Sequence, residues 1–331
     1  AYYVLGNALS EYGKIAEAEE AYQQAVQRLP DDASAFNNLG HVLIEFGRKA
    51  EAETALRTAI DPHRASAHFN LHAVVYRDDD LDPAIASLEA ALATSTDDGK
   101  SQFFHAMCLE QKGDKDAAIA SFDKVPLDDN GYNHWLDSWD YALRQIQQNS
   151  SIRVFGTGAE TYAHAQDATT IDGLTLEFGV RFGTSIRQIA ARTDGVLHGF
   201  DSFQGLPEAW HNNPVGEYTT HGELPQVPDN VTLHVGLFDD TIASFKAEHD
   251  GPIRFMNVDC DIYSSTKTIL DQLHDRIVPG SVIAFDEYFC NPSWRFDEFK
   301  AFQEAVEQYG WEYDYLSFCP FARQAVVRIG G

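Results

Sequence analysis

The chain has 331 residues, of which 44% are hydrophobic and 23% are charged, ordinary values for a soluble globular protein with room for two domains. Its formal net charge of −27 at pH 7 argues against nucleic acid and anionic membrane surfaces as partners, because no lysine- or arginine-rich run opposes it. No apolar stretch approaches the roughly 20 residues of a membrane span.

Other features of the whole sequence indicate a cytoplasmic protein. The sequence starts with neither the basic n-region nor the apolar h-region of a signal peptide. The cysteines are scattered, form no C-x-x-C pair and are predicted to be reduced, mostly buried thiols. They are Cys108, Cys260, Cys290 and Cys319.

The N-terminal part of the chain repeats itself. The stretch Ala1–Gly13 recurs as Ala35–Gly47 at a spacing of 34, and further copies follow at spacings of 32 and 34. This period, with small alanines at helix contacts, resembles the tetratricopeptide repeat. Equivalent positions are Leu5/Leu39, Gly6/Gly40, Gly13/Gly47, Ala18/Ala52 and Ala25/Ala59 in the first two copies, then Leu71, Ala84 and Ala91, and finally His105, Gly113, Ala118 and Val125.

An amphipathic segment over Tyr132–Gln148 is predicted to close this array as a capping helix. We therefore assign residues 1–149 to an all-α repeat domain of about four repeats plus this helix, and residues 150–331 to a second domain. Such arrays usually bind peptides or proteins in a concave groove. Docking of a partner or substrate protein, and self-association or a purely architectural role, both stay open.

After residue 149 the pattern changes to short apolar runs that alternate with helical segments. Alternating strands and helices predict a doubly wound α/β, Rossmann-like sheet, and the last two strands predict an antiparallel hairpin. This is the arrangement of class I methyltransferases. The predicted strands are Leu174–Phe178, Val196–Phe200, Val231–Val235, Ile253–Val258, Val282–Phe285, Tyr313–Phe318 and Gln324–Ile329; the helices are Ser185–Arg192, Thr241–Glu248, Ser265–Asp275 and Asp297–Tyr309.

The first strand of this domain ends in an acid followed by glycines. Glu177, Gly179 and Gly183 form an acid-x-Gly-x-x-x-Gly turn, which suits a ligand with an amino acid and a ribose rather than a pyrophosphate. Asp201 ends the next strand and is placed to accept hydrogen bonds from ribose hydroxyls. The alternatives are a strand-to-helix turn without function and, for Asp201, a helix N-cap.

Acids also follow two later strands. Asp259 comes after one strand, and Asp286 and Glu287 come after the next. Because adjacent parallel strands end at the same edge of a sheet, these three acids are predicted to converge. Three hard oxygen ligands suit Mg²⁺. For each acid taken alone, a cap or a solvated loop carboxylate is the alternative.

Taken together, these residues resemble the macrocin O-methyltransferase family, which methylates sugars in glycosides of natural products. The resemblance covers Arg153 to Arg328. It is carried by F-G-T-G-A-E-T-Y, L-E-F-G-V-R-F-G-T-S, F-D-S-F-Q-G-L-P-E, G-L-F-D-D-T-I, V-D-C-D-I-Y-S-S-T, F-D-E-Y and W-R-F-D-E-F-K-A-F. The family often has Asp-Asp where this chain has Asp286-Glu287, and the repeats are not part of its antibiotic-modifying members.

The resemblance implies S-adenosylmethionine as the cofactor and a divalent metal, usually Mg²⁺, on Asp259, Asp286 and Glu287. It places the general base at Asp261, two residues after Asp259. Asp259 is a predicted metal ligand and is also predicted to be catalytic. Asp261 could instead support the side chains that form the site. To the cofactor residues Glu177, Gly179, Gly183 and Asp201 we add Thr184, Ser185, Ser202 and Asp240.

The segment from Gln204 to Gln226 is long for a connecting loop and is predicted to cover the acceptor as a lid. His211 and His221 in this loop are alternative bases, although surface histidines without a role are commoner. Tyr162 and His164 precede the first strand, where an N-terminal segment could cover the cofactor.

The predicted function is therefore metal-assisted O-methylation of a sugar, glycoside or other small-molecule natural product. A second hypothesis has the repeats dock a protein or carrier-bound substrate. A third is a non-catalytic repeat adaptor that senses the cofactor. A sensor would not need the predicted metal site, so these acids argue against it: Asp259, Asp261, Asp286 and Glu287. A dinucleotide oxidoreductase is weaker, because its glycine spacing differs.

Overall fold

The computed structural model describes residues 1–60, 65–95, 98–126 and 132–330. The chain divides into two compact units. The first unit consists of Ala1–Trp139 and Val154–Ala159, and the second of Asp140–Arg153 and Glu160–Gly331. The division falls inside helix α9 (Tyr132–Gln148), which has the bounds predicted from sequence. The domain boundary after Asn149 stays a prediction.

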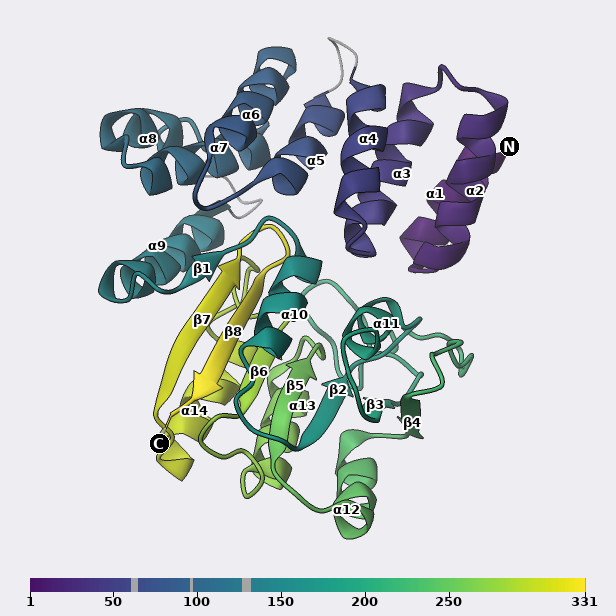
Figure 1. The fold of residues 1–331 in the computed structure, drawn as a ribbon, viewed down its shortest axis with the longest axis vertical. Helices are drawn as coiled ribbons and strands as arrows, with labels where there is room; N and C mark the ends of the chain where they lie inside the picture. Colours follow the sequence, from purple (N-terminus) through teal and green to yellow (C-terminus); the bar gives the residue numbers. More distant parts are fainter. Residues whose placement is uncertain (61–64, 96–97, 127–131, 331) are drawn as a thin grey trace. The chain divides into compact units, whose positions relative to one another are not determined.

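The first unit is built from helices that pair in chain order, as the period of 34 residues predicts (Figure 1). Glycine is required where the paired helices touch: a Cβ at Gly6 would lie 2.6 Å from the Tyr22 ring, and one at Gly40 would lie 2.5 Å from Leu56. The pairs are α1 (Tyr2–Tyr12) with α2 (Ile15–Arg28), α3 (Ala33–Glu45) with α4 (Lys49–Ala59), α5 (Ala65–Val75) with α6 (Asp82–Thr94), and α7 (Gly99–Lys112) with α8 (Lys115–Phe122).

The described residues contain a mixed eight-stranded sheet with the order β1-β7-β8-β6-β5-β2-β3-β4, and strands β2 to β8 belong to the second unit. Strands β6, β5, β2, β3 and β4 run parallel, and β8 is antiparallel to both β6 and β7, so the predicted terminal hairpin is confirmed. The strands are β1 (Arg153–Val154), β2 (Leu174–Phe178), β3 (Leu197–Asp201), β4 (Val231–Val235), β5 (Ile253–Val258), β6 (Val282–Phe285), β7 (Tyr313–Cys319) and β8 (Gln324–Ile329).

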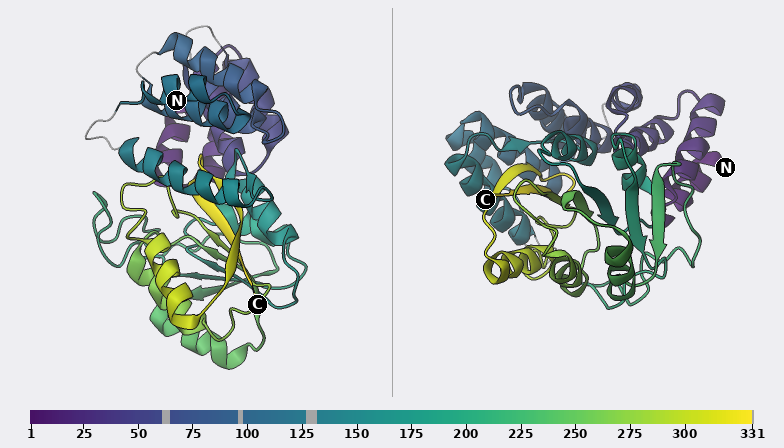
Figure 2. Two further views of the ribbon diagram at one scale, coloured as in Figure 1. Left: turned by 90° about the vertical axis from the view of Figure 1, so that its left-hand side faces the viewer. Right: turned by 60° about the horizontal axis from the view of Figure 1, so that its bottom comes forward.

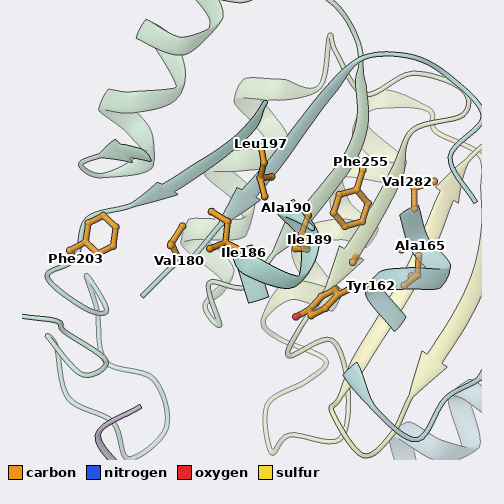
Figure 3. Close-up of a cluster of buried hydrophobic side chains, with 12 residues drawn as sticks. Tyr162, Ala165, Val180, Ile186, Ile189, Ala190, Leu197, Phe203, Phe255 and Val282 are labelled. Carbon is orange, nitrogen blue, oxygen red and sulfur yellow. The ribbon is translucent and has the colours of Figure 1, made fainter. Parts of the chain in front are cut away.

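Helices cover both faces of this sheet. On one face α10 (Gly158–Asp167) and α11 (Thr184–Ala190) pack on inward-facing side chains such as Leu197, Phe255 and Val282 (Figure 3). The other face carries α12 (Phe238–Glu248), α13 (Tyr263–Leu273) and α14 (Glu298–Tyr309) (Figure 2). The two faces follow from the alternation of side chains along each strand, which puts Ala284 and its neighbour Phe285 on opposite sides.

Two elements were not predicted from the sequence. Strand β1 has only two residues, too short to show a period of two. Helix α10 is only ten residues long, and its buried face is formed by small and polar residues such as Thr161, Ala165 and Gln166 rather than an apolar stripe. Its contacts with the sheet therefore became visible only in the folded chain.

All four cysteines are buried, as predicted, and none of them forms a disulfide bond within the described residues. Among the described helices, none has the length and apolar character needed to cross a bilayer.

Candidate active site

The predicted site residues come together because parallel strands end in line. Beyond the paired residues of β2, β5 and β6, the backbone hydrogen bonds continue: Asp259 N–H donates to Phe178 O (2.8 Å), and Asp286 N–H donates to Val258 O (2.9 Å). The residues that follow β2, β5 and β6 therefore lie side by side at the carboxyl edge of the sheet, where such folds bind ligands.

The glycine turn after β2 is shaped by this close approach. Gly179 has a φ of 93°, and a Cβ built on it would lie 1.7 Å from the backbone oxygen of Asp259. Gly183 has a φ of 81° and is the N-cap of α11, which begins at Thr184. Both glycines thus adopt a left-handed conformation that other residues rarely tolerate, and the turn brings Glu177 next to Asp259.

Glu177 is fully buried in the penultimate position of β2. Its Oε1 accepts hydrogen bonds from Ser185 Oγ (2.5 Å) and Asn257 Nδ2 (3.2 Å). Its Oε2 is buried and has no hydrogen-bond partner in the described part of the chain. Burial raises the pKa of Glu177 to about 8, and the hydrogen bonds from Ser185 and Asn257 offset only part of that shift. A carboxylate oxygen left without a donor is suited to the ammonium group of a ligand.

Asp201, at the end of β3, accepts hydrogen bonds from three backbone N–H groups. Its Oδ2 accepts the N–H groups of Val180 (2.8 Å) and Arg181 (2.7 Å), and its Oδ1 accepts the N–H group of Phe203 (2.7 Å). These bonds tie the glycine turn to the start of the lid loop. The neighbouring Ser202 Oγ accepts the N–H group of Gln204 (3.1 Å). Contact of Asp201 and Ser202 with a ribose stays a prediction.

Replacing Asp201 should destabilise the free protein. We expect Asp201→Ala to lower the free energy of unfolding of the second unit by about 2 kcal/mol, because three backbone donors lose a charged acceptor. Asp240→Ala is the matched control: Asp240 is another predicted cofactor residue, but it is exposed in the first turn of α12, so its replacement should change stability by less than about 0.5 kcal/mol. Scanning calorimetry without cofactor measures both, and equal losses would contradict this role for Asp201.

Asp259 and Asp261 stand beside Asp286. Burial raises the pKa of Asp259 well above its ordinary value, and the charges of Asp286 and Asp261 raise it further. The pKa of Asp261 is raised to about 7 by burial and by Asp286, while Arg181 and Arg323 lower it. Asp261 also has a φ of 64°, a strained conformation for a residue other than glycine. Strain and a pKa near neutrality are both common in catalytic groups.

The third predicted metal ligand does not join the other two. Both oxygens of Glu287 contact Arg323 Nη1, at 2.9 and 3.1 Å. Asp286 Oδ1 accepts hydrogen bonds from Gln324 Nε2 (2.6 Å) and Tyr162 OH (3.3 Å). Over residues 1–60, 65–95, 98–126 and 132–330, no three His, Cys, Asp or Glu side chains are arranged to hold a metal ion. The side chains therefore do not fit the predicted Mg²⁺ site.

Several residues of the site were missed from the sequence. Tyr162 and Gln324 together hold Asp286, whereas the sequence indicates Tyr162 only as part of a covering segment and Gln324 only as the start of a strand. Asn257, which donates to Glu177, is indicated by the sequence: it is a polar residue within the otherwise apolar run Phe255–Val258. Glu298 is fully buried, with Oε1 accepting the N–H group of Cys260 (3.4 Å). It lies in the motif W-R-F-D-E-F-K-A-F, which by itself predicts no role for this acid.

The predicted lid loop packs beside Asp261. Its residues Leu206, Trp210 and Tyr218 form an apolar cluster with Ile262, and Trp210 Nε1 donates to Asp297 Oδ2 (3.0 Å). The two histidines that were considered as alternative bases, His211 and His221, are exposed. The loop thus covers the residue next to the predicted base, as a lid would.

Profiles of two protein families match parts of the chain, and several solved structures are similar to it. The profile of a methyltransferase domain matches residues 176–288, and that of a tetratricopeptide repeat matches residues 3–67 and 74–132. Among solved structures, calicheamicin methyltransferase CalS11 is 21% identical, with a TM-score of 0.42 and coverage of 66% of this chain and 92% of that chain. The O-methyltransferase NovP is 18% identical, with a TM-score of 0.41 and coverage of 53% and 82%. The tetratricopeptide-repeat protein YrrB is 22% identical, with a TM-score of 0.36 and coverage of 43% and 76%. No curated protein matches the chain.

The second unit therefore contains a methyltransferase domain. The whole chain combines this domain with N-terminal tetratricopeptide repeats, so the predicted fold and the predicted enzyme class, an S-adenosylmethionine-dependent methyltransferase, are confirmed.

Proposed function

We propose that the chain transfers a methyl group from S-adenosylmethionine to a hydroxyl oxygen of a sugar, a glycoside or another small-molecule natural product. The observation that carries the proposal is the buried, unpartnered Oε2 of Glu177 at the same sheet edge as Asp259 and Asp261. The cofactor, when bound, supplies a methyl group activated by a sulfonium. The acceptor class rests on the sequence motifs that resemble the macrocin O-methyltransferases.

In this proposal each acid has a separate task. Glu177 binds the ammonium group of the cofactor through Oε2, with Ser185 and Asn257 holding its other oxygen. Gly179 and Gly183 let the backbone of the turn approach the cofactor, beside Thr184, and Asp201, Ser202 and Asp240 stay proposed contacts of its ribose and base. Asp261 removes the proton of the acceptor hydroxyl, because it is the acid of the site that lies next to the lid.

In this proposal no step uses a metal ion, because Arg323 binds Glu287, and Gln324 and Tyr162 donate hydrogen bonds to Asp286. Positioning of the acceptor falls instead to the lid and to the side chains of the sheet edge. A hydroxyl oxygen must be held about 3 Å from the methyl carbon and in line with the bond that breaks. The contact of Trp210 with Asp297 fixes one side of the lid for this task.

Binding of S-adenosylhomocysteine should release a proton from Glu177. In the free protein this carboxyl has a pKa of about 8, so it is mostly neutral at pH 7, and pairing with an ammonium group favours its charged form. We expect about one proton released per cofactor at pH 7, and affinity that rises between pH 6 and 8. Calorimetry in two buffers of different ionisation enthalpy measures this release.

The matched variant is Glu177→Gln, which keeps the shape of the side chain. It should abolish the proton release and weaken binding about 10- to 100-fold, as expected for loss of a charge-assisted hydrogen bond. The stability of the protein without cofactor provides a second test. Because the pKa of Glu177 is higher in the folded than in the unfolded chain, wild type should lose stability as the pH rises from the ordinary carboxyl range to about 8. Glu177→Gln should not show this loss. No binding of S-adenosylhomocysteine by wild type would refute the proposed function.

A second candidate function is docking of a protein, either a substrate or a partner, by the repeats. A line of amide hydrogen bonds across α1, α3 and α5 favours it: Asn38 Nδ2 donates to Asn7 Oδ1 (2.9 Å), Asn37 Nδ2 to Asn38 Oδ1 (3.1 Å), and Asn70 Nδ2 to Asn37 Oδ1 (3.1 Å). Amide side chains in such a line are suited to a peptide backbone. Self-association through the repeats, and a cytoplasmic location, also stay predictions.

A further inference from the structure

Arg323 forms an ion pair with Glu287, the third of the predicted metal ligands. Its Nη1 bridges both oxygens of Glu287, at 2.9 and 3.1 Å. The side chain of Glu287 is 15% exposed and that of Arg323 is 40% exposed, so this is a partly desolvated ion pair rather than a surface one. Glu287 therefore already has a cation supplied by the chain itself.

The backbone holds Arg323 at some cost. Arg323 is the last residue of the turn between β7 and β8, and its φ is 61°. This left-handed conformation is unfavourable for a residue other than glycine. The backbone oxygen of Arg323 accepts the N–H group of Tyr288 (3.1 Å), which fixes the turn against the residue after Glu287. The guanidinium is thus placed by two contacts with the segment that follows β6.

The guanidinium also serves the neighbouring acids. Charges of Glu287 and Asp286 raise the pKa of Arg323 although burial lowers it, so the group stays charged. Arg323 in turn helps to lower the pKa of Asp261, which burial and Asp286 raise. Within the described residues, Nε and Nη2 of Arg323 make no hydrogen bond to protein. These two donors are available for an acceptor oxygen beside Asp261.

We propose that Arg323 takes the place of the divalent metal ion of related enzymes, and that methyl transfer by this chain does not require a metal. The inference rests on the proposed function. In the reaction, the acceptor oxygen forms a bond to the methyl carbon, and the methyl–sulfur bond breaks with its electron pair left on sulfur. The hydroxyl proton passes to the Asp261 carboxylate. Nε and Nη2 of Arg323 stabilise the negative charge that develops on the oxygen.

The test loads the full chain with S-adenosylhomocysteine and then measures the binding of Mn²⁺ to it by electron paramagnetic resonance. Wild type should show no specific Mn²⁺ site. Arg323→Ala releases Glu287 toward Asp259 and Asp286 and should bind Mn²⁺ at least about tenfold more tightly than wild type. Arg323→Lys keeps the positive charge and should behave like wild type. The double variant Arg323→Ala/Glu287→Gln should lose the gained site.

Two results would overturn the inference. One is a tight Mn²⁺ site in wild type that Asp259→Asn or Asp286→Asn removes; this measurement needs no folded Arg323 variant. The other is the absence of Mn²⁺ binding in both wild type and Arg323→Ala, because Arg323 would then not be what excludes the metal. Failure of the cofactor to load is seen before any Mn²⁺ is added, so it would count against the proposed function and not against the role of Arg323.

Discussion

Gly179→Ala is expected to cost the second unit more than about 4 kcal/mol in free energy of unfolding, enough to prevent its folding at 37 °C. Two effects add at this position. The φ of 93° is unfavourable for any residue with a Cβ, and that Cβ would lie 1.7 Å from the backbone oxygen of Asp259. Because the obstructing atom belongs to the backbone of β5's end, no rotamer change can relieve the clash.

Gly310→Ala is the matched control in the same unit. Gly310 also has a positive φ, of 68°, but a Cβ there meets nothing within 4 Å. This substitution should cost only about 1 kcal/mol, the conformational part alone. Scanning calorimetry of both variants separates strain from steric overlap. Equal, small losses would mean that β2 and β5 do not approach as closely as described, and the predicted contact between the glycine turn and Asp259 would be wrong.

Asp261→Asn is expected to lower kcat for methyl transfer about 10²- to 10⁴-fold while leaving the affinity for S-adenosylhomocysteine within about twofold. The amide keeps the size of the side chain but cannot take the acceptor's proton. Glycosides and catechols, screened by transfer of a labelled methyl group, supply the acceptor for this assay. Rapid methyl transfer by the variant would remove Asp261 from the mechanism.

The alternative bases give the control for this experiment. His211→Gln and His221→Gln alter exposed side chains of the lid, so each should leave kcat within about fivefold of wild type. If one of them instead abolished the reaction and Asp261→Asn did not, the base would be that histidine. A large loss in all three variants, with cofactor binding intact, would indicate that Asp261 orients the lid rather than accepting the proton.

The sequence by itself determined most of the architecture. The spacing of 34 residues predicted the helix pairs, since each pair must bury its apolar face on the next at equal intervals. Five of the seven predicted strands have the predicted bounds and two differ by one residue, because the strands appear in the sequence as short apolar runs between turns. The positions of Asp259, Asp286 and Glu287 after two neighbouring strands predicted that these three acids converge at one sheet edge. The backbone hydrogen bonds place Asp259 and Asp286 side by side there, whereas the side chain of Glu287 pairs with Arg323.

Only the tertiary structure decided what each acid contacts. Asp259, Asp286 and Glu287 have a spacing that suits three metal ligands, yet Arg323, which is far along the chain, pairs with Glu287, and Tyr162 and Gln324 hold Asp286. The sequence predicts the residue at which each strand ends, to within one residue. The direction of a carboxylate depends instead on donors that other elements bring to it, and no local pattern records them.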